Sequence, residues 1–251
     1  MQEDNKEIKL AIITGGSRGL GKALMDAYEV REWSTLEFSR SGTGLNHLPV
    51  DLSNLDAQLS VLENQLQTLA KANWNRVVFI NNAGLLTPIG PVRALSDAQI
   101  VSNLEVNLMS GIRLISAFVR AFGACGAEVT VANISSGAAL KGYAGWPLYC
   151  AAKAGLENYI RALAAEQGGA VTPMTCINIE PGVIDTDMQM EIRETDAQNF
   201  PEVARFIELK RGGQLRSAKS VARAILSIID SKPDNGDRYR ISEQAPGQAS
   251  S

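Results

Sequence analysis

Short apolar runs alternate with longer amphipathic stretches along nearly the whole chain. A short apolar run between turn residues is typical of a buried strand, whereas apolar residues that recur every three or four positions indicate a helix. Strands are therefore expected at residues 10–13, 35–38, 77–80, 129–134, 174–179 and 238–241. Helices are expected at residues 21–32, 55–71, 96–122, 149–166 and 217–229.

This alternation of strands and helices predicts βαβ units with right-handed connections and a mostly parallel sheet covered on both faces. The predicted fold class is α/β: a single-domain, Rossmann-like, doubly wound sheet in three α/β/α layers. Residues 185–213 are less regular and rich in charge and methionine, and we expect them to form a small lid. The polar tail at residues 243–251 is expected to be frayed or disordered.

Composition fits this picture and excludes several classes of protein. Among the 251 residues 45% are hydrophobic and 20% charged, which excludes disorder over most of the length. The net charge of -3 gives no support for nucleic-acid binding. No apolar run reaches the ~18 residues of a membrane helix, and residues 1–9 lack the apolar core of a secretory signal.

Histidine and cysteine usage narrows the chemistry further. His47 is the only histidine, which excludes a His-Glu-x-x-His zinc site and disfavours histidine-based catalysis; we expect no metal. Cys125, Cys150 and Cys176 are odd in number and widely spaced, so they indicate reduced thiols in a cytoplasmic protein.

A glycine-rich turn follows the first predicted strand and opens the first predicted helix. Its residues run Thr14-Gly15-Gly16-Ser17-Arg18-Gly19-Leu20-Gly21. Glycines at such a junction allow a tight turn and a close approach of the backbone to a pyrophosphate. The helix N-terminus then offers free N–H groups and the positive end of its dipole. The turn predicts a dinucleotide site.

Further motifs follow in a fixed order, and together they carry a family resemblance. They are Asn81-Asn82-Ala83-Gly84 after the third strand, Asn107 in the long helix, Ser136, Tyr149-x-x-x-Lys153, and Pro181-Gly182 followed by Thr186. With the glycine turn, this order resembles the short-chain dehydrogenase/reductase family over residues 8–242. The resemblance implies a reductase that uses a nicotinamide dinucleotide.

The resemblance assigns catalysis to Asn107, Ser136, Tyr149 and Lys153. Tyr149 and Lys153 stand four apart and so share one helix face. A nearby ammonium favours the phenolate, so we expect a lowered pKa for Tyr149, which would act as the general acid/base. Ser136 would bind the substrate carbonyl, with Ser135 as its near competitor, and Lys153 would also bind the nicotinamide ribose. Asn107 would hold a water that links Lys153 to solvent.

The end of the second strand bears on the choice between NAD and NADP. An NAD-preferring fold usually has an acidic residue there, but this position is expected at Ser39 and is followed by Arg40. Arg18 and Arg40 suit a 2′-phosphate, so NADP(H) is the predicted cofactor. A register shift of two would instead bring the Glu37 carboxylate to the ribose. By resemblance, Asp51 meets the adenine amino group.

The predicted cofactor-binding residues are Gly15, Ser17, Arg18, Gly19, Leu20, Gly21, Ser39, Arg40, Asp51, Leu52, Asn82, Ala83, Gly84, Tyr149, Lys153, Pro181, Gly182, Ile184 and Thr186.

Within the family, residues 133–136, 145–153 and 181–189 resemble the branch of sepiapterin reductases and benzil reductase-like enzymes. The resemblance implies an aromatic or vicinal dicarbonyl substrate. Ser136, Trp146, Met188 and Glu243 are the predicted substrate residues. Trp146 would form an aromatic wall, and Met188 and Met190 would adapt to a flat ligand. Alternatively, these three side chains only pack the lid onto the core, and Glu243 is a surface residue rather than a pterin ligand.

Other classes of function remain as alternatives. They are a sepiapterin reductase or another short-chain alcohol dehydrogenase, and a non-catalytic NADP-binding regulator, which would have no need for the full set of four catalytic residues. A nucleotide-sugar epimerase or dehydratase usually requires a longer C-terminal substrate domain. The resemblance also implies a homodimer or homotetramer, with a small-molecule carbonyl substrate and neither nucleic acid nor membrane as partner.

Overall fold

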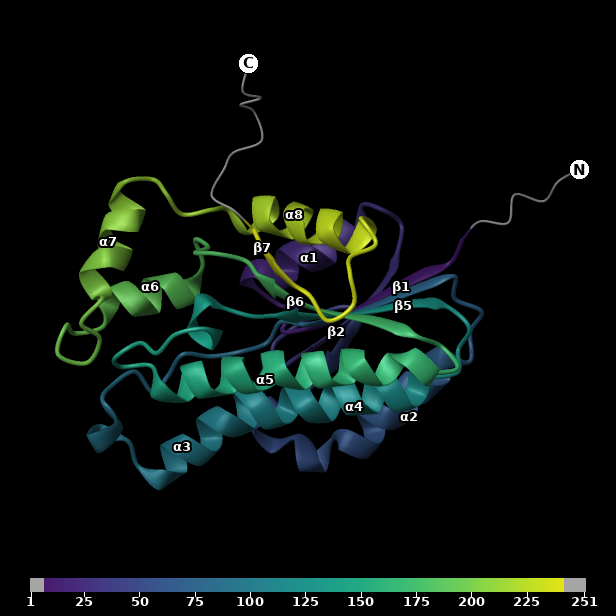
Figure 1. The fold of residues 1–251 in the computed structure, drawn as a ribbon, viewed down its shortest axis with the longest axis horizontal. Helices are drawn as coiled ribbons and strands as arrows, with labels where there is room; N and C mark the ends of the chain where they lie inside the picture. The colour runs from purple at the N-terminus through teal and green to yellow at the C-terminus, as the bar shows by residue number, and fades with distance from the viewer. Residues whose placement is uncertain (1–6, 242–251) are drawn as a thin grey trace, which may run out of the picture.

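A computed structural model describes residues 7–241 of the chain, and seven parallel strands form one sheet within them (Figure 1). In sheet order these are β3 (His47–Pro49), β2 (Ser34–Ser39), β1 (Lys9–Thr14), β4 (Arg76–Asn81), β5 (Glu128–Ile134), β6 (Met174–Glu180) and β7 (Arg238–Arg240). The strand order reverses between β1 and β4, which is where doubly wound sheets open a ligand crevice at their carboxyl ends. The predicted doubly wound α/β fold is confirmed.

Helices cover both faces of the sheet (Figure 1). α1 (Gly19–Glu29) and α8 (Ala218–Asp230) pack on one face, while α2 (Leu59–Ala70), α4 (Ser110–Phe122) and α5 (Pro147–Ala165) pack on the other. Successive side chains of a strand point to opposite faces, so each strand contributes to two cores. In β4, Val77 and Phe79 belong to the core under α4, and Val78 and Ile80 belong to the core under α1.

Local details differ from the sequence prediction. Ser96 caps the predicted long helix together with Gln99, but that helix consists of α3 (Asp97–Leu104), one π turn (Glu105–Met109) and α4. The helix predicted at residues 55–71 is a 3₁₀ turn followed by α2. The prediction also missed β3, because three residues that include proline are too short for an apolar pattern. Residues 185–213, where a lid is expected, contain two helices, α6 (Asp187–Glu194) and α7 (Val203–Arg211).

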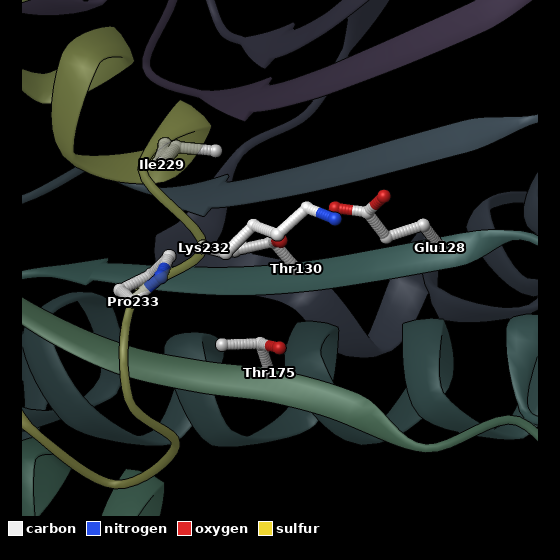
Figure 2. A pocket seen from close by; sticks show the side chains of 6 residues that line it. All are labelled: Glu128, Thr130, Thr175, Ile229, Lys232 and Pro233. Carbon is white, nitrogen blue, oxygen red and sulfur yellow. The ribbon is translucent and has the colours of Figure 1, made fainter.

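One surface depression lies outside the predicted site. A shallow depression of about 320 Å³ at the amino ends of β5 and β6 is lined by Glu128, Thr130, Thr175, Ile229, Lys232 and Pro233 (Figure 2). It lies at the opposite edge of the sheet from the predicted catalytic residues.

In residues 7–241 no helix has the length and apolarity to cross a membrane, and no cluster of three metal-ligating side chains occurs.

A chain of buried amides crosses the carboxyl edge of the sheet. The Thr14 hydroxyl donates to Asn81 Oδ1 (3.4 Å), Asn81 Nδ2 to Asn133 Oδ1 (3.0 Å), and Asn133 Nδ2 to Asn178 Oδ1 (2.9 Å). Asn178 Nδ2 then donates to the backbone oxygen of Glu157 on α5 (3.2 Å). Because buried polar groups are costly unless paired, this chain fixes four strands and α5 in one register.

Replacing the central amide is expected to destabilise the fold. Asn133→Leu would leave a donor of Asn81 and an acceptor of Asn178 buried and unpaired, which costs about 3 kcal/mol in the free energy of unfolding. Urea unfolding followed by circular dichroism measures this. Thr130→Val, on the same strand but outside the amide chain, is the control and should change stability by less than about 1 kcal/mol. Equal stability of the two variants would contradict the prediction.

Candidate active site

One cavity of about 950 Å³ opens at the carboxyl ends of the central strands. Every predicted cofactor-binding residue lines it, and so do the predicted substrate residues Ser136, Trp146 and Met188. Asn107 lies behind the wall and does not line the cavity, and Glu243 falls outside the described residues. The fold thus gathers motifs that are spread over most of the chain around one space.

The glycine turn has the geometry that a dinucleotide requires. Gly15 and Gly19 adopt left-handed backbone angles (φ 70° and 55°), and a Cβ on Gly21 would lie 2.0 Å from the Gly15 oxygen. The Thr14 hydroxyl accepts hydrogen bonds from the backbone N–H groups of Asn82 and Ala83, both at 2.9 Å. No side chain caps the start of α1, so its first N–H groups can bind a phosphate.

The two candidate ribose residues at the end of β2, Ser39 and Glu37, differ in their position relative to the cavity. Ser39 and Arg40 line the cavity, whereas Glu37 does not. The buried Glu37 carboxylate instead contacts His47 Nδ1 at 2.5 Å and accepts from the Ser39 hydroxyl at 3.1 Å. The register is therefore the one predicted from the sequence. Arg18 also lines the cavity and reaches Asp187 of α6 at 3.4 Å.

Tyr149, Lys153 and Ser136 meet in the same cavity. Tyr149 and Lys153 project from one face of α5, with Lys153 Nζ 5.7 Å from the centre of the Tyr149 ring. Lys153 is only 4% exposed and donates to the backbone oxygen of Ile134 at 2.8 Å. The Ser136 hydroxyl lines the cavity beside Tyr149 and lowers the pKa of that phenol, whereas the Ser135 hydroxyl donates to Glu157. Of the two candidate serines, Ser136 is thus the one that faces the tyrosine.

Burial governs the ionisation of this pair. It raises the pKa of Tyr149 to about 12, against the opposing hydrogen bond from Ser136. It lowers the pKa of Lys153 to about 8, against the opposing charge of Glu157. The expectation that the ammonium lowers the pKa of Tyr149 is wrong for this structure, because desolvation of the phenolate dominates. The phenol keeps its proton at neutral pH, which is the form a proton donor needs.

Asn107 stands on the π turn and is tied to the loop after β4. Its Oδ1 accepts from the N–H of Leu85 (2.8 Å), and its Nδ2 donates to the oxygen of the same residue (2.9 Å). A Cβ on Gly84 would lie 3.2 Å from Asn107 Oδ1 and 3.8 Å from Lys153 Nζ. The missing side chain of Gly84 therefore leaves space between the amide and the ammonium.

An aromatic wall closes the side of the cavity next to Tyr149. Trp146 stacks on Phe200 with ring centres 4.2 Å apart, meets Tyr149 edge-on at 5.9 Å, and contacts Phe206 of α7 at 5.6 Å. Trp146 thus lines the cavity and also packs against residues of the expected lid. Its position fits both predicted roles, the aromatic wall and the packing of the lid. Met190 is 47% exposed and does not line the cavity, and its expected contact with a ligand is not supported.

Comparison with known proteins places the chain. Residues 9–197 match the family model described as short chain dehydrogenase. The chain belongs to this family. It is 34% identical to a benzil reductase ((S)-benzoin forming) of Bacillus subtilis, over 94% of this chain and 99% of that protein. It is also 34% identical to a sepiapterin reductase of Bos taurus, over 88% of this chain and 89% of that protein.

A solved short-chain dehydrogenase/reductase from Saccharomyces cerevisiae has the same fold, with a TM-score of 0.79 and 23% identity over 95% of this chain and 97% of the other. The chain is therefore a short-chain oxidoreductase acting on CH–OH or carbonyl groups, in a family that uses NAD(P). The glycine turn and the cavity fit such a dinucleotide.

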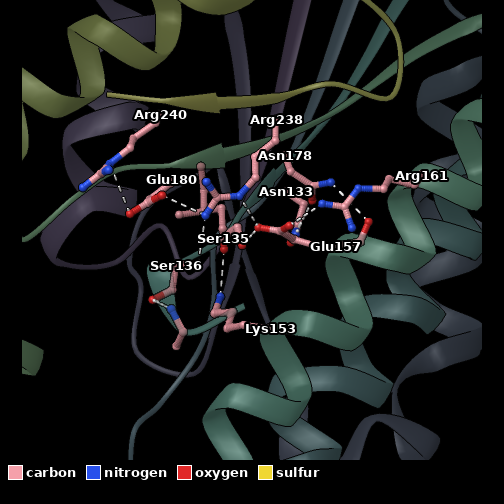
Figure 3. A network of polar contacts seen from close by, with 12 residues as sticks. Asn133, Ser135, Ser136, Lys153, Glu157, Arg161, Asn178, Glu180, Arg238 and Arg240 are labelled. Carbon is pink, nitrogen blue, oxygen red and sulfur yellow. Dashed lines mark hydrogen bonds and ion pairs between the residues drawn. The ribbon is translucent and has the colours of Figure 1, made fainter. Parts of the chain in front are cut away.

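Several residues of this short-chain dehydrogenase site escape sequence reasoning. Glu157, Glu180 and Arg238 form a polar cluster next to Ser136 (Figure 3), in which both carboxylates are buried, and Tyr143 and Arg205 also line the cavity. A signal existed for Glu157, because it lies four residues after Lys153 on the same helix face. None existed for Arg238, whose partners lie far away in the sequence.

The buried ammonium should lower the stability of the folded enzyme. Lys153→Met is expected to raise the free energy of unfolding at pH 7 by on the order of 2 kcal/mol. The folded wild type releases this proton near pH 8, while the unfolded chain holds it to about 10.5. Wild-type stability therefore rises between these pH values, and the advantage of the variant shrinks.

Chemical denaturation from pH 6 to 10.5 would measure this difference, with exposed Lys219→Met as the matched control. A variant less stable than wild type at pH 7, or a difference that does not change with pH, would contradict the prediction.

Proposed function

We propose that the protein is an NADPH-dependent carbonyl reductase that transfers a hydride to a ketone, with Tyr149 as the proton donor. The observation that carries the proposal is the meeting of Tyr149 and Ser136 in one cavity, with the buried Lys153 5.7 Å from the centre of the Tyr149 ring. The substrate class that we propose is an aromatic or vicinal dicarbonyl. The aromatic wall at Trp146 and the names of the benzil reductase relatives support this choice.

The chain's own residues divide the work around one carbonyl oxygen. Bound NADPH supplies the hydride from its nicotinamide ring. The Ser136 and Tyr149 hydroxyls donate to the carbonyl oxygen, and this polarises the bond and stabilises the developing alkoxide. Tyr149, protonated at neutral pH, then gives its proton to that oxygen. Lys153 holds the ribose and stabilises the phenolate left behind, and Asn107 binds a water that returns the proton.

Arg18 and Arg40 support the choice of NADPH over NADH. Both line the cavity, and Arg40 directly follows Ser39 at the end of β2, where NAD-preferring proteins usually have an acidic residue; the nearby Glu37 contacts His47. Two guanidiniums can bind a 2′-phosphate with charge-assisted hydrogen bonds. The lid, α6 and α7, would close over the substrate and exclude water.

A sepiapterin reductase is the second candidate function, because the cow enzyme of that name matches most of this chain. Its proposed pterin ligand, Glu243, lies outside the described residues.

We also propose a cytoplasmic homodimer or homotetramer that associates through the long helix and α5. The exposed side chains of Val101 and Met109, on α3 and the π turn, support this association.

The proton-donor role predicts the behaviour of one conservative variant. Tyr149→Phe keeps the ring against Trp146 but removes the hydroxyl, so turnover should fall at least 100-fold. NADPH oxidation with benzil, isatin, simple diketones and sepiapterin measures this and identifies the substrate class. Tyr159→Phe, on the same helix but outside the cavity, is the control and should keep its activity. An unchanged rate in Tyr149→Phe would refute the role.

Cofactor preference is tested at the two arginines. Arg18→Ala and Arg40→Ala should each lower kcat/KM for NADPH about 10- to 100-fold, since each removes a charge-assisted bond to the 2′-phosphate. Values for NADH should change by less than about threefold. Lys22→Ala removes a positive charge from α1 outside the cavity and serves as the control. Wild-type kcat/KM with NADH equal to or above that with NADPH would exclude the preference.

A further inference from the structure

A closed ring of hydrogen bonds holds the backbone turn that carries Ser136 (Figure 3). The Ser135 hydroxyl donates to Glu157 Oε1. Arg238 Nε donates to the same oxygen at 2.8 Å, and Arg238 Nη2 donates to the backbone oxygen of Ser136 at 3.2 Å. Two successive residues of the turn are thus anchored to one ion pair, with α5 on one side and β7 on the other.

Glu157 is held rigidly within this ring. Its side chain is 1% exposed, and its second oxygen accepts from Arg161 Nη2 at 2.7 Å. Its backbone oxygen accepts from Asn178, the last member of the amide chain across the sheet. A buried carboxylate is strongly unfavourable without such partners, but with both oxygens bonded to guanidiniums its position is well defined.

The guanidinium of Arg238 also holds the neighbouring wall of the cavity. Its Nη2 lies 2.8 Å from Glu180 Oε2, and Arg240 Nε lies 3.6 Å from the other Glu180 oxygen. Glu180 lines the cavity directly before Pro181. One side chain from the last strand thereby fixes the ends of both β5 and β6 where they border the reacting centre.

We propose that Glu157 and Arg238 are positioning residues for the reductase, because they fix the turn that holds Ser136 opposite Tyr149. Neither residue touches the reacting atoms in this scheme. Its kinetic consequences rest on the proposed function, while the position of Ser136 is a property of the chain itself.

The charge of Glu157 also acts on Lys153, and its effect depends on the charged groups that surround Glu157. These are Lys153 and Arg161 on α5 and Arg238 on β7, with Glu180 on β6 beyond it. The Glu157 charge raises the pKa of Lys153 against the lowering effect of burial. Without that charge Lys153 would lose its proton at lower pH, so the alkaline limb of the kcat profile should shift downward in Glu157→Gln.

The test compares Glu157→Gln, Arg238→Met, Arg238→Lys and Ser135→Ala with wild type. We expect kcat to fall on the order of 10- to 100-fold in Glu157→Gln and Arg238→Met, because misplacing a reacting group by about 1 Å has this effect. The dissociation constant of NADPH should change by less than about threefold. Arg238→Lys should keep more of kcat than Arg238→Met does. The losses of kcat in Ser135→Ala and Glu157→Gln should be less than additive in the double variant, since both substitutions break the same contact.

Arg161→Gln is the matched control, because it removes a guanidinium from Glu157 without touching either serine. A purely structural role for the ring would lower stability in every variant but leave kcat and the alkaline limb of the folded enzyme unchanged. Values of kcat within twofold of wild type in Arg238→Met and Glu157→Gln would overturn the proposal.

Two outcomes need separate readouts. If Glu157→Gln does not fold, Arg238→Met and Ser135→Ala decide, and kcat within twofold of wild type in both would overturn the proposal. If wild type reduces none of the carbonyls, the proposed function fails, and crystal structures of the variants decide on the positioning role. A Ser136 hydroxyl displaced from Tyr149 supports that role, and an unmoved one overturns it.

Discussion

The arrangement of the rest of this site depends on one buried ammonium group, that of Lys153. Lys153 has lost nearly all of its water, and burial lowers its pKa to about 8. The fold compensates with the backbone oxygen of Ile134 and with the charge of Glu157 one helical turn away. It also leaves space toward Asn107 by placing a glycine at position 84. The position of α5 against the end of β5 is therefore tightly constrained.

The two sides of the cavity are each fixed in place by a different kind of interaction. On the sheet side, buried amides and ion pairs join the strand ends and leave little freedom. On the side of residues 185–213, exposed ion pairs such as Arg18–Asp187 and Lys141–Glu202 typically contribute less than about 1 kcal/mol each. This segment is held mainly by apolar packing, in which Phe200 and Phe206 lie against Trp146.

Sequence reasoning was sufficient where chemistry is local and insufficient where it depends on distant contacts. The glycine turn, the Tyr149–Lys153 spacing and the strand pattern are short-range features, and the structure places them as expected. The strand β3 escaped because it is short. The pKa of Tyr149 escaped because burial depends on the whole fold. Arg238 escaped because its partners Glu157 and Ser136 lie 81 and 102 positions away.

That long separation has a consequence for how the enzyme is assembled. The glycine turn lies between β1 and α1 and is made early in synthesis, whereas the anchor of Ser136 comes with β7, more than 200 residues later. A chain without β7 would keep the glycine turn but lose the Arg238 anchor of Ser136.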